Sequence, residues 1–349
     1  MGERFDLAIF GSTPFALLLA GCLAGQHKRR VALIGARFSP LRLPQGLSLS
    51  VGPATRPETW AMLRRLEAET LSLLGTAGAA SAVARQPVTF RSDLAATASA
   101  LAHMQHMAMG SGLKVGAPPS GGGLVVRNVA VIGETSLHAA ADVWLRDIGV
   151  ERLTADDDPR LAIPRRGDAT VSTARRTISA AQIVLADDAA IIAHLDPALI
   201  PAPLLLTEAM AVLTSPVRLP PPGPVIFADR RVVVSSRGRS LLAHVFGSSS
   251  ADARLASALE GDLPLVRLAT RRLRLLESTD GAPLIGWLKD PRVFIAAGMG
   301  AIAPFLAPLV ARSLADDTTA EERPWLAAHD PARMQSRIAV NEFAWGSAA

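Results

Sequence analysis

The stretch Asp6-Leu-Ala-Ile-Phe-Gly-Ser-Thr-Pro-Phe-Ala16 decides the fold. The apolar residues before Gly11 predict a short buried strand, the residues 11–14 predict a tight turn, and the apolar run 15–25 predicts a helix. A second short apolar run, 31–34, predicts another buried strand. Strand, helix and strand of these lengths form the first βαβ unit of a dinucleotide-binding fold.

The same stretch has a competing interpretation, because Leu19-Ala20-Gly21-Cys22 resembles a lipoprotein cleavage box. A secretory signal begins with a basic segment, whereas here Glu3 and Asp6 offset Arg4. The turn residues 11–14 also argue against a transmembrane helix. We therefore predict a cytoplasmic protein without a transmembrane segment, in which Cys22 is a small apolar residue of a packed helix.

Composition excludes several classes of function. With 349 residues and 49% hydrophobic residues, the chain can bury one large core or two medium ones. The net charge is +5, but the basic residues are scattered and tyrosine is absent, so we predict no nucleic-acid binding. A single cysteine excludes an intrachain disulfide and a cysteine-based metal site, and we predict no bound metal.

Further along the chain, helical patterns cover residues 57–74, 93–110 and 136–149. Strands are expected at 168–173 and 182–186, and strand patterns fill 204–250, which predicts a second, mixed or antiparallel sheet. A basic segment, 264–276, precedes a turn at 279–281. Residues 293–297 predict a strand, and a long apolar helix is expected from there to Leu314.

Several segments together resemble a known family. Gly281-Ala-Pro-Leu-Ile-Gly286, the run 293–308 and a helix that ends in Ala315-Asp316 resemble the C-terminal FAD motif of the D-amino acid oxidase family, which includes glycine and sarcosine oxidases. Gly122-Gly-Leu-Val-Val126 and the strand 181–186 are similar to pieces of that family in the same order. The resemblance covers roughly residues 5 to 315.

The resemblance implies an α/β fold with a Rossmann-like FAD-binding domain and an inserted β-rich substrate domain. The FAD-binding domain would be discontinuous and comprise residues 1–77, 135–192 and 278–330. The substrate-type domain would comprise 78–134 and 193–277, and 331–349 would form a C-terminal tail.

The resemblance also implies non-covalent FAD and the residues around it. The pyrophosphate would lie on the N-terminus of the first helix, on the N–H groups of Ser12, Phe15 and Ala16, while Pro14 has no N–H to donate. The implied cofactor-binding residues fall in the first turn, after the second strand, in the strand 168–173 and in the C-terminal motif: Gly11, Ser12, Thr13, Pro14, Phe15, Ala16, Gly35, Ala36, Arg37, Val171, Gly298, Met299, Gly300, Ala301, Ile302 and Ala303.

The sequence departs from the family pattern at several of these positions. Thr13 stands where the fingerprint has its second glycine, which lets the backbone approach the pyrophosphate. Gly35 stands where the family has an acid for the ribose, and nearby Arg37 is either a contact for a 2′-phosphate or a surface arginine. Asp187-Asp188 follows a strand after which the family has a glycine. Ala301 and Ala303 replace residues that are commonly glycine.

No catalytic residue is assigned. Family members that oxidise amino acids hold the substrate carboxylate with an arginine, but Leu275-Leu276 and Ser235-Ser236 stand at the usual places. Arg237 or Arg239 could rebuild this clamp, or both lie in an exposed hairpin turn. His103 and His106 share a helix face without a nearby carboxylate, which is typical of a helix surface. His244 is either a base or a core histidine.

Two functions remain open. The first is an FAD-dependent oxidoreductase that transfers a hydride from a small amine-like substrate to the flavin. The second is a degenerate flavoprotein-like subunit that binds FAD weakly or not at all and acts through a protein partner. The preserved Gly298-Met299-Gly300 turn and Gly11 favour the first, and the altered motifs and high apolar content favour the second.

Overall fold

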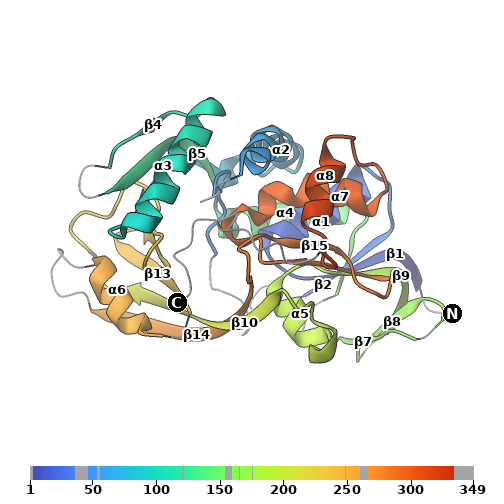
Figure 1. Ribbon diagram of the computed structural model, residues 1–349. Coiled ribbons are helices and arrows are strands. Elements are labelled where there is room, and N and C mark those ends of the chain that lie inside the picture. Colours follow the sequence, from blue (N-terminus) through green and yellow to red (C-terminus); the bar gives the residue numbers. More distant parts are fainter. Residues whose placement is uncertain are drawn as a thin grey trace.

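The structure is a computed structural model that describes residues 3–35, 46–52, 56–118, 122–153, 159–164, 166–174, 176–247, 249–259 and 266–333. One large β-sheet lies in each half of the molecule, and helices pack against both (Figure 1). This architecture confirms the predicted fold class. The predicted domain boundaries stay a prediction.

The first sheet is built around parallel strands in the order β16-β9-β1-β2-β6, with β15 antiparallel on the edge and a β7–β8 hairpin beside β9. β1 and β2 match the two predicted strands, and the apolar residues of both are buried in the core. The strands are β1 (Glu3–Phe10), β2 (Val31–Ile34), β6 (Glu151–Leu153), β7 (Arg160–Ala162), β8 (Ala169–Ser172), β9 (Thr177–Leu185), β15 (Leu284–Trp287) and β16 (Val293–Ala297).

Helix α1 (Pro14–Gly25) connects β1 to β2 and is buried along nearly its whole length. Proline at its first position and the Thr13 side chain, which accepts a hydrogen bond from the Ala16 N–H, set its start. Gly21 allows α4 (Glu134–Asp147) to pack closely, because a Cβ at this position would lie 1.7 Å from the Trp144 ring. Burial raises the pKa of the Cys22 thiol to about 12, so this cysteine is a packing residue.

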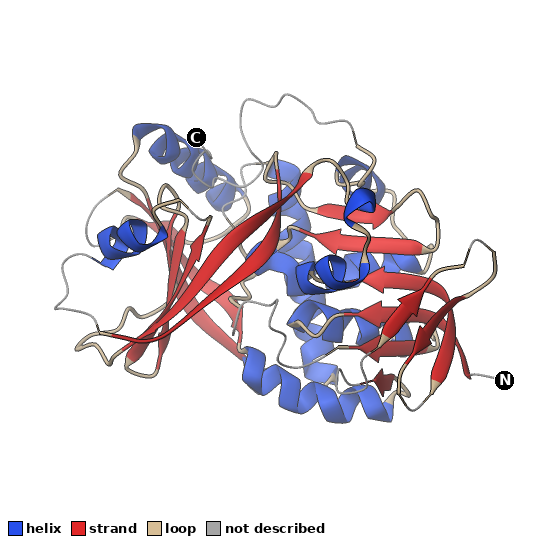
Figure 2. Ribbon diagram, turned by 90° about the horizontal axis from the view of Figure 1, so that it is seen from below, coloured by secondary structure: helices blue, strands red, loops and turns tan. Residues whose placement is uncertain are grey.

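The second sheet has the order β14-β10-β13-β12-β11-β3-β5-β4 and is mostly antiparallel. Its long strands cross the half of the molecule opposite the parallel sheet (Figure 2). The strands are β3 (Val83–Arg91), β4 (Val115–Gly116), β5 (Gly123–Ile132), β10 (Leu204–Thr214), β11 (Val225–Phe227), β12 (Val232–Arg237), β13 (Ser240–Phe246) and β14 (Arg267–Ser278).

The remaining helices are α2 (Pro57–Thr76), α3 (Ala95–Gly110), α5 (Asp188–His194), α6 (Ala251–Leu259), α7 (Ala307–Leu314) and α8 (Glu322–Ala328). Figure 1 shows α1, α4, α7 and α8 on one side of the parallel sheet and α5 on the other. In the parts of the chain that the structure describes, none of the helices has the length and apolar character needed to cross a bilayer.

Three sequence expectations need correction. The single long helix expected after the strand 293–297 begins instead as a 3-10 helix, η4 (Gly300–Leu306), because Pro304 lies inside it, and only then continues as α7. The basic segment 264–276 contains most of the edge strand β14, whose leucines alternate with arginines. Helix α4 begins two residues earlier than expected, at Glu134.

Candidate functional site

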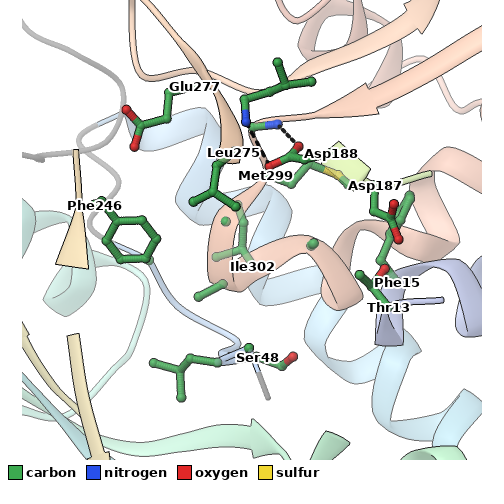
Figure 3. Close-up of a pocket in the computed structure, with 18 of the residues that line it drawn as sticks. Thr13, Phe15, Ser48, Asp187, Asp188, Phe246, Leu275, Glu277, Met299 and Ile302 are labelled. Carbon is green, nitrogen blue, oxygen red and sulfur yellow. Dashed lines mark hydrogen bonds between the residues drawn. The ribbon is translucent and has the colours of Figure 1, made fainter. Parts of the chain in front are cut away.

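A cavity of about 700 Å³ lies between the two sheets. One wall is formed where β1, β9 and β16 end and α1 begins, and the other comes from β10, β12, β13 and β14 of the second sheet. Figure 3 shows Thr13, Phe15 and Asp187 on one side and Phe246 and Glu277 on the other. Open α/β sheets bind ligands at the carboxyl ends of their strands, where the strand order reverses, and β1 and β9 meet at such a point.

Most of the predicted cofactor residues reach this cavity, and several do not. Those in its lining are Thr13, Pro14, Phe15, Gly298, Met299, Gly300, Ala301, Ile302 and Ala303. Gly11, Ser12, Ala16 and Gly35 lie around the first turn, outside the lining. Val171 is fully buried in the core beside the parallel sheet, and Ala36 and Arg37 lie outside the described residues.

The turn before α1 has its hydrogen-bond donors engaged within the protein. The Ser12 N–H donates to Asp187 Oδ2 at 3.1 Å, and the Ala16 N–H donates to Thr13 Oγ1 at 3.4 Å. Pro14 has no N–H. Two of the three donors expected for a pyrophosphate are therefore used by side chains of the protein itself.

Asp187 is placed there by the start of α5. It is the N-cap of this helix, and its Oδ1 accepts a hydrogen bond from the Ala190 N–H at 2.8 Å. Its other oxygen reaches the turn before α1, and the side chain is only 9% exposed. One buried carboxylate thus connects the ends of β1 and β9.

The position expected to hold the adenosine ribose has no room for an acidic side chain. A Cβ at Gly35 would lie 2.7 Å from the Gly11 carbonyl oxygen, so the two backbones are packed directly against each other. The Gly35 N–H donates to the Leu153 carbonyl oxygen at 3.2 Å. Any larger residue at position 35 would require the strand ends to move apart.

The C-terminal motif, in contrast, faces open space. Gly298 and Gly300 have φ values of +65° and +54°, a region that favours glycine. A Cβ on Gly300 would meet nothing within 4 Å, and one on Gly298 would meet nothing closer than 3.8 Å. The segment 46–52 fixes this turn, because the Leu49 N–H donates to the Ala301 carbonyl oxygen at 2.8 Å.

Asp188 points its carboxylate at this turn. It accepts hydrogen bonds from the Leu276 N–H at 3.3 Å and the Gly298 N–H at 3.5 Å (Figure 3). Burial raises the pKa of Asp188 to about 7, with the negative charges of Asp187 and Glu277 adding to the rise and the two N–H groups opposing it. Asp188 is therefore a group that gains or loses a proton near neutral pH.

Two more carboxylates complete the charged part of the lining, and we call Glu134, Asp187, Asp188 and Glu277 the pocket acids. Glu277 forms an ion pair with Arg231, and Glu134 lies 3.5 Å from His138. Arg231 is the one arginine or lysine among the lining residues that the structure describes, and buried His244 is also in the lining. The rest of the lining is mostly aliphatic, aromatic or small.

Sequence reasoning missed Glu134, Arg231 and Glu277, which come from α4, the turn before β12 and β14, respectively. The signal that pointed toward the site was Asp187-Asp188 in place of the family's glycine. In the described residues, no group of three or more histidine, cysteine, aspartate or glutamate side chains is arranged to hold a metal ion.

The other arginine and histidine candidates from the sequence are not among the described residues that line the cavity. Arg237 and Arg239 flank the hairpin between β12 and β13 and are largely exposed. Partial burial lowers the pKa of Arg237, and the nearby carboxylate of Glu134 opposes this shift. His103 and His106 are exposed on α3, as expected for a helix surface. Neither Arg237 nor Arg239 is among the lining residues that the structure describes, and a carboxylate clamp made of either stays a prediction.

Comparisons with known proteins rest on structure. No family model matches the sequence, and no curated protein matches it. The glycine oxidase from Geobacillus kaustophilus superimposes with a TM-score of 0.70 at 16% identity, over 96% of this chain and 100% of that chain. The L-proline dehydrogenase from P. horikoshii gives 0.71 at 15% identity, over 95% and 98%. An L-amino acid deaminase from Proteus myxofaciens gives 0.70 at 12% identity, over 93% of each chain.

The chain thus has the fold of the D-amino acid oxidase family, as its sequence predicted. FAD, the cofactor that this resemblance implies, does not fit the residues at the start of α1. Two donors for its pyrophosphate are already engaged, and a buried carboxylate adds negative charge at the same place. The open turn at 298–300 would accommodate a planar ring, but the dinucleotide needs both ends of the site.

Proposed function

We propose that the pocket binds a small organic amine in its cationic form, and that the protein is a flavoprotein-like subunit with weak or no FAD binding. The observation that carries this proposal is the charge of the pocket. Among the lining residues that the structure describes, four are carboxylates, one is an arginine and most of the others are apolar, and the arginine is paired with Glu277. Carboxylates held away from water favour a cation close to them.

The chemistry of the lining supports an ammonium group with an apolar body. Phe15 and Phe246 lie in opposite walls, and aromatic faces attract cations that have lost part of their hydration. An anionic ligand would be repelled by the pocket acids and would have to compete with Glu277 for Arg231. Binding of the cation would favour the ionised form of Asp188. The protein partner of such a subunit stays a prediction from the sequence.

A second candidate, the FAD-dependent oxidoreductase of small amines, is favoured by one observation. Gly298 and Gly300 leave the backbone uncovered beside the cavity, as close contact with a flat ring would require. This candidate shares the amine ligand with the first. It differs in requiring FAD to bind although the Asp187 carboxylate accepts a hydrogen bond from the Ser12 N–H, a donor expected for the pyrophosphate.

Calorimetric titration of the full chain tests the ligand class with three probes of one shape: choline, the neutral 3,3-dimethylbutan-1-ol, and the anionic 3,3-dimethylbutanoate. We expect choline to bind at least tenfold more tightly than the alcohol, about 1.4 kcal/mol, and the carboxylate not to bind. The variant Asp188→Asn should weaken choline several-fold and leave the alcohol unchanged. Equal binding of choline and the alcohol would overturn the proposal.

The matched control is Asp196→Asn. Asp196 caps an exposed turn outside the pocket lining, so this substitution should leave choline binding unchanged.

The two candidate functions are separated by the visible absorbance spectrum of the purified protein with and without added FAD. A protein without flavin bands supports the first candidate. Stoichiometric flavin bands would overturn the first and favour the oxidoreductase.

A further inference from the structure

We infer that the Asp187 carboxylate occupies the place where this fold holds a dinucleotide's pyrophosphate, and that this one side chain blocks dinucleotide binding. The inference rests on the proposed function, whose weak or absent FAD binding it explains. In dinucleotide-binding folds the pyrophosphate lies against the N–H groups where β1 passes into α1. Here the Ser12 N–H of that turn donates to Asp187 Oδ2 at 3.1 Å.

The carboxylate is held in this place from two sides. Its second oxygen accepts a hydrogen bond from the Ala190 N–H at 2.8 Å, at the start of α5. A Cβ at Gly11 would lie 3.1 Å from Asp187 Oδ2, so the side chain fills the space directly beside the turn. Asp187 therefore cannot move aside for a phosphate without losing two backbone hydrogen bonds.

The negative charge of Asp187 opposes the binding of a pyrophosphate, and so does the space that its side chain fills. The site is nearly closed to water, since Asp187 is 9% exposed and Ser12 is 6% exposed. Like charges interact strongly where water is largely excluded. An anionic group of the protein and an anionic ligand therefore compete for the same N–H donor.

This inference predicts a gain of binding from a single substitution. In Asp187→Ser, the hydroxyl can still cap α5 through the Ala190 N–H, but it is too short to reach the Ser12 N–H and carries no charge. The second variant, Asp187→Asn, keeps the volume and removes only the charge. Asp196→Ser removes a capping carboxylate of the turn Pro197–Leu199, outside the pocket lining, and serves as the matched control.

The measurement is calorimetric titration of the wild type and the three variants with FAD, ADP and riboflavin. We expect Asp187→Ser to bind FAD and ADP at least tenfold more tightly than the wild type, and Asp187→Asn to gain less. Riboflavin has no phosphate, so its affinity should change less than twofold. Circular dichroism and thermal unfolding check that each variant folds, and if Asp187→Ser does not fold, Asp187→Asn carries the test.

The outcomes separate the two proposals. If the wild type binds FAD tightly, both the inference and the proposed weak FAD binding are overturned. If the wild type binds FAD weakly and neither variant gains affinity, the inference alone is overturned, and the choline titration still decides the proposed function. An equal gain for riboflavin and FAD would also overturn the inference, because the substitution would then have loosened the pocket in general.

Discussion

Two clusters of charged side chains, in different parts of the molecule, differ in how the negative charges of their acidic residues are balanced. The first, which we call the α8 cluster, joins α2, α7 and α8 and consists of Arg65, Glu69, Arg312 and Glu322. Glu322 has no exposed surface and accepts hydrogen bonds from Arg312 at 3.0 Å and Arg65 at 2.8 Å. Arg312 also donates to Glu69 at 2.7 Å. Two arginines thus pair with two glutamates of the cluster, and Arg65 also pairs with the exposed Glu321.

The pocket acids are balanced differently, since the lining residues that the structure describes include one arginine and four carboxylates, while Glu134 also lies near His138 and Arg237. Buried charges are expensive unless they are paired. Burial raises the pKa of Glu322, but the hydrogen bonds from Arg312 and the Thr319 N–H outweigh it and leave this pKa below its usual value. The pKa of Asp188 is raised instead. In the α8 cluster, acids paired with arginines hold helices together, whereas the pocket acids surround a cavity and support the cationic ligand proposed for it.

The largest effect is expected in the α8 cluster. Arg312→Met should lower the free energy of unfolding by about 3–5 kcal/mol, because it removes a partner from fully buried Glu322 and another from partly exposed Glu69. Urea unfolding measures the change. The double variant Arg312→Met/Glu322→Met removes both charges and should be the more stable of the two. A double variant less stable than the single one would contradict this view of the cluster.

The contribution of Asp188 to stability should fall as the pH rises, whereas that of a paired acid such as Glu322 falls as the pH is lowered. The pKa of Asp188 is about 7 in the folded protein against an ordinary value of 3.8, so the folded state holds a proton that the unfolded chain releases near pH 4. Stability should therefore fall as the pH rises from about 4 to about 7, by roughly 2–4 kcal/mol. The loss is complete above pH 7 and absent below pH 4.

Urea unfolding of Asp188→Asn at pH 5 and pH 8 measures this contribution. The variant should lack the Asp188 part of the slope, so its stability relative to the wild type should improve between the two pH values. Asp196→Asn, with a comparable change at an exposed cap, should keep the wild-type slope. Parallel slopes in the wild type and Asp188→Asn would show that Asp188 does not titrate in this range.

Sequence patterns predicted the elements around the pocket better than its charges. The strands β1, β2 and β16 and helix α1 could be predicted because each is a short apolar run bounded by a turn. Strand β14 was described from the sequence only as a basic segment, because its many arginines hide the strand pattern, although it pairs with β10 along its length. Glu134 and Arg231 carried no signal, since the fold alone brings them to the cavity from distant parts of the chain.

The replacement of the family's glycine by Asp187-Asp188 was visible in the sequence, but its consequence was not. A sequence shows that two acids stand where the backbone should pass a cofactor. It does not show that one of them accepts a hydrogen bond from the Ser12 N–H and the other from the Gly298 N–H. These contacts join residues more than a hundred positions apart, and only the packing of β1, β9 and β16 brings them together.

The smallest effect, and the sharpest contrast with the α8 cluster, is expected at Arg231. Arg231→Met should lower the free energy of unfolding by only about 1–2 kcal/mol, because Glu277 is partly exposed and loses one partner. The same change should raise the affinity for choline about fivefold, since it removes the arginine found among the described lining residues. Arg239→Met, the same substitution at an exposed hairpin, should change neither quantity. In the α8 cluster the arginines stabilise the fold, whereas in the pocket the arginine mainly limits how strongly a cation binds. Weaker choline binding in Arg231→Met would contradict that distinction, because Arg231 would then be contributing to the ligand site itself.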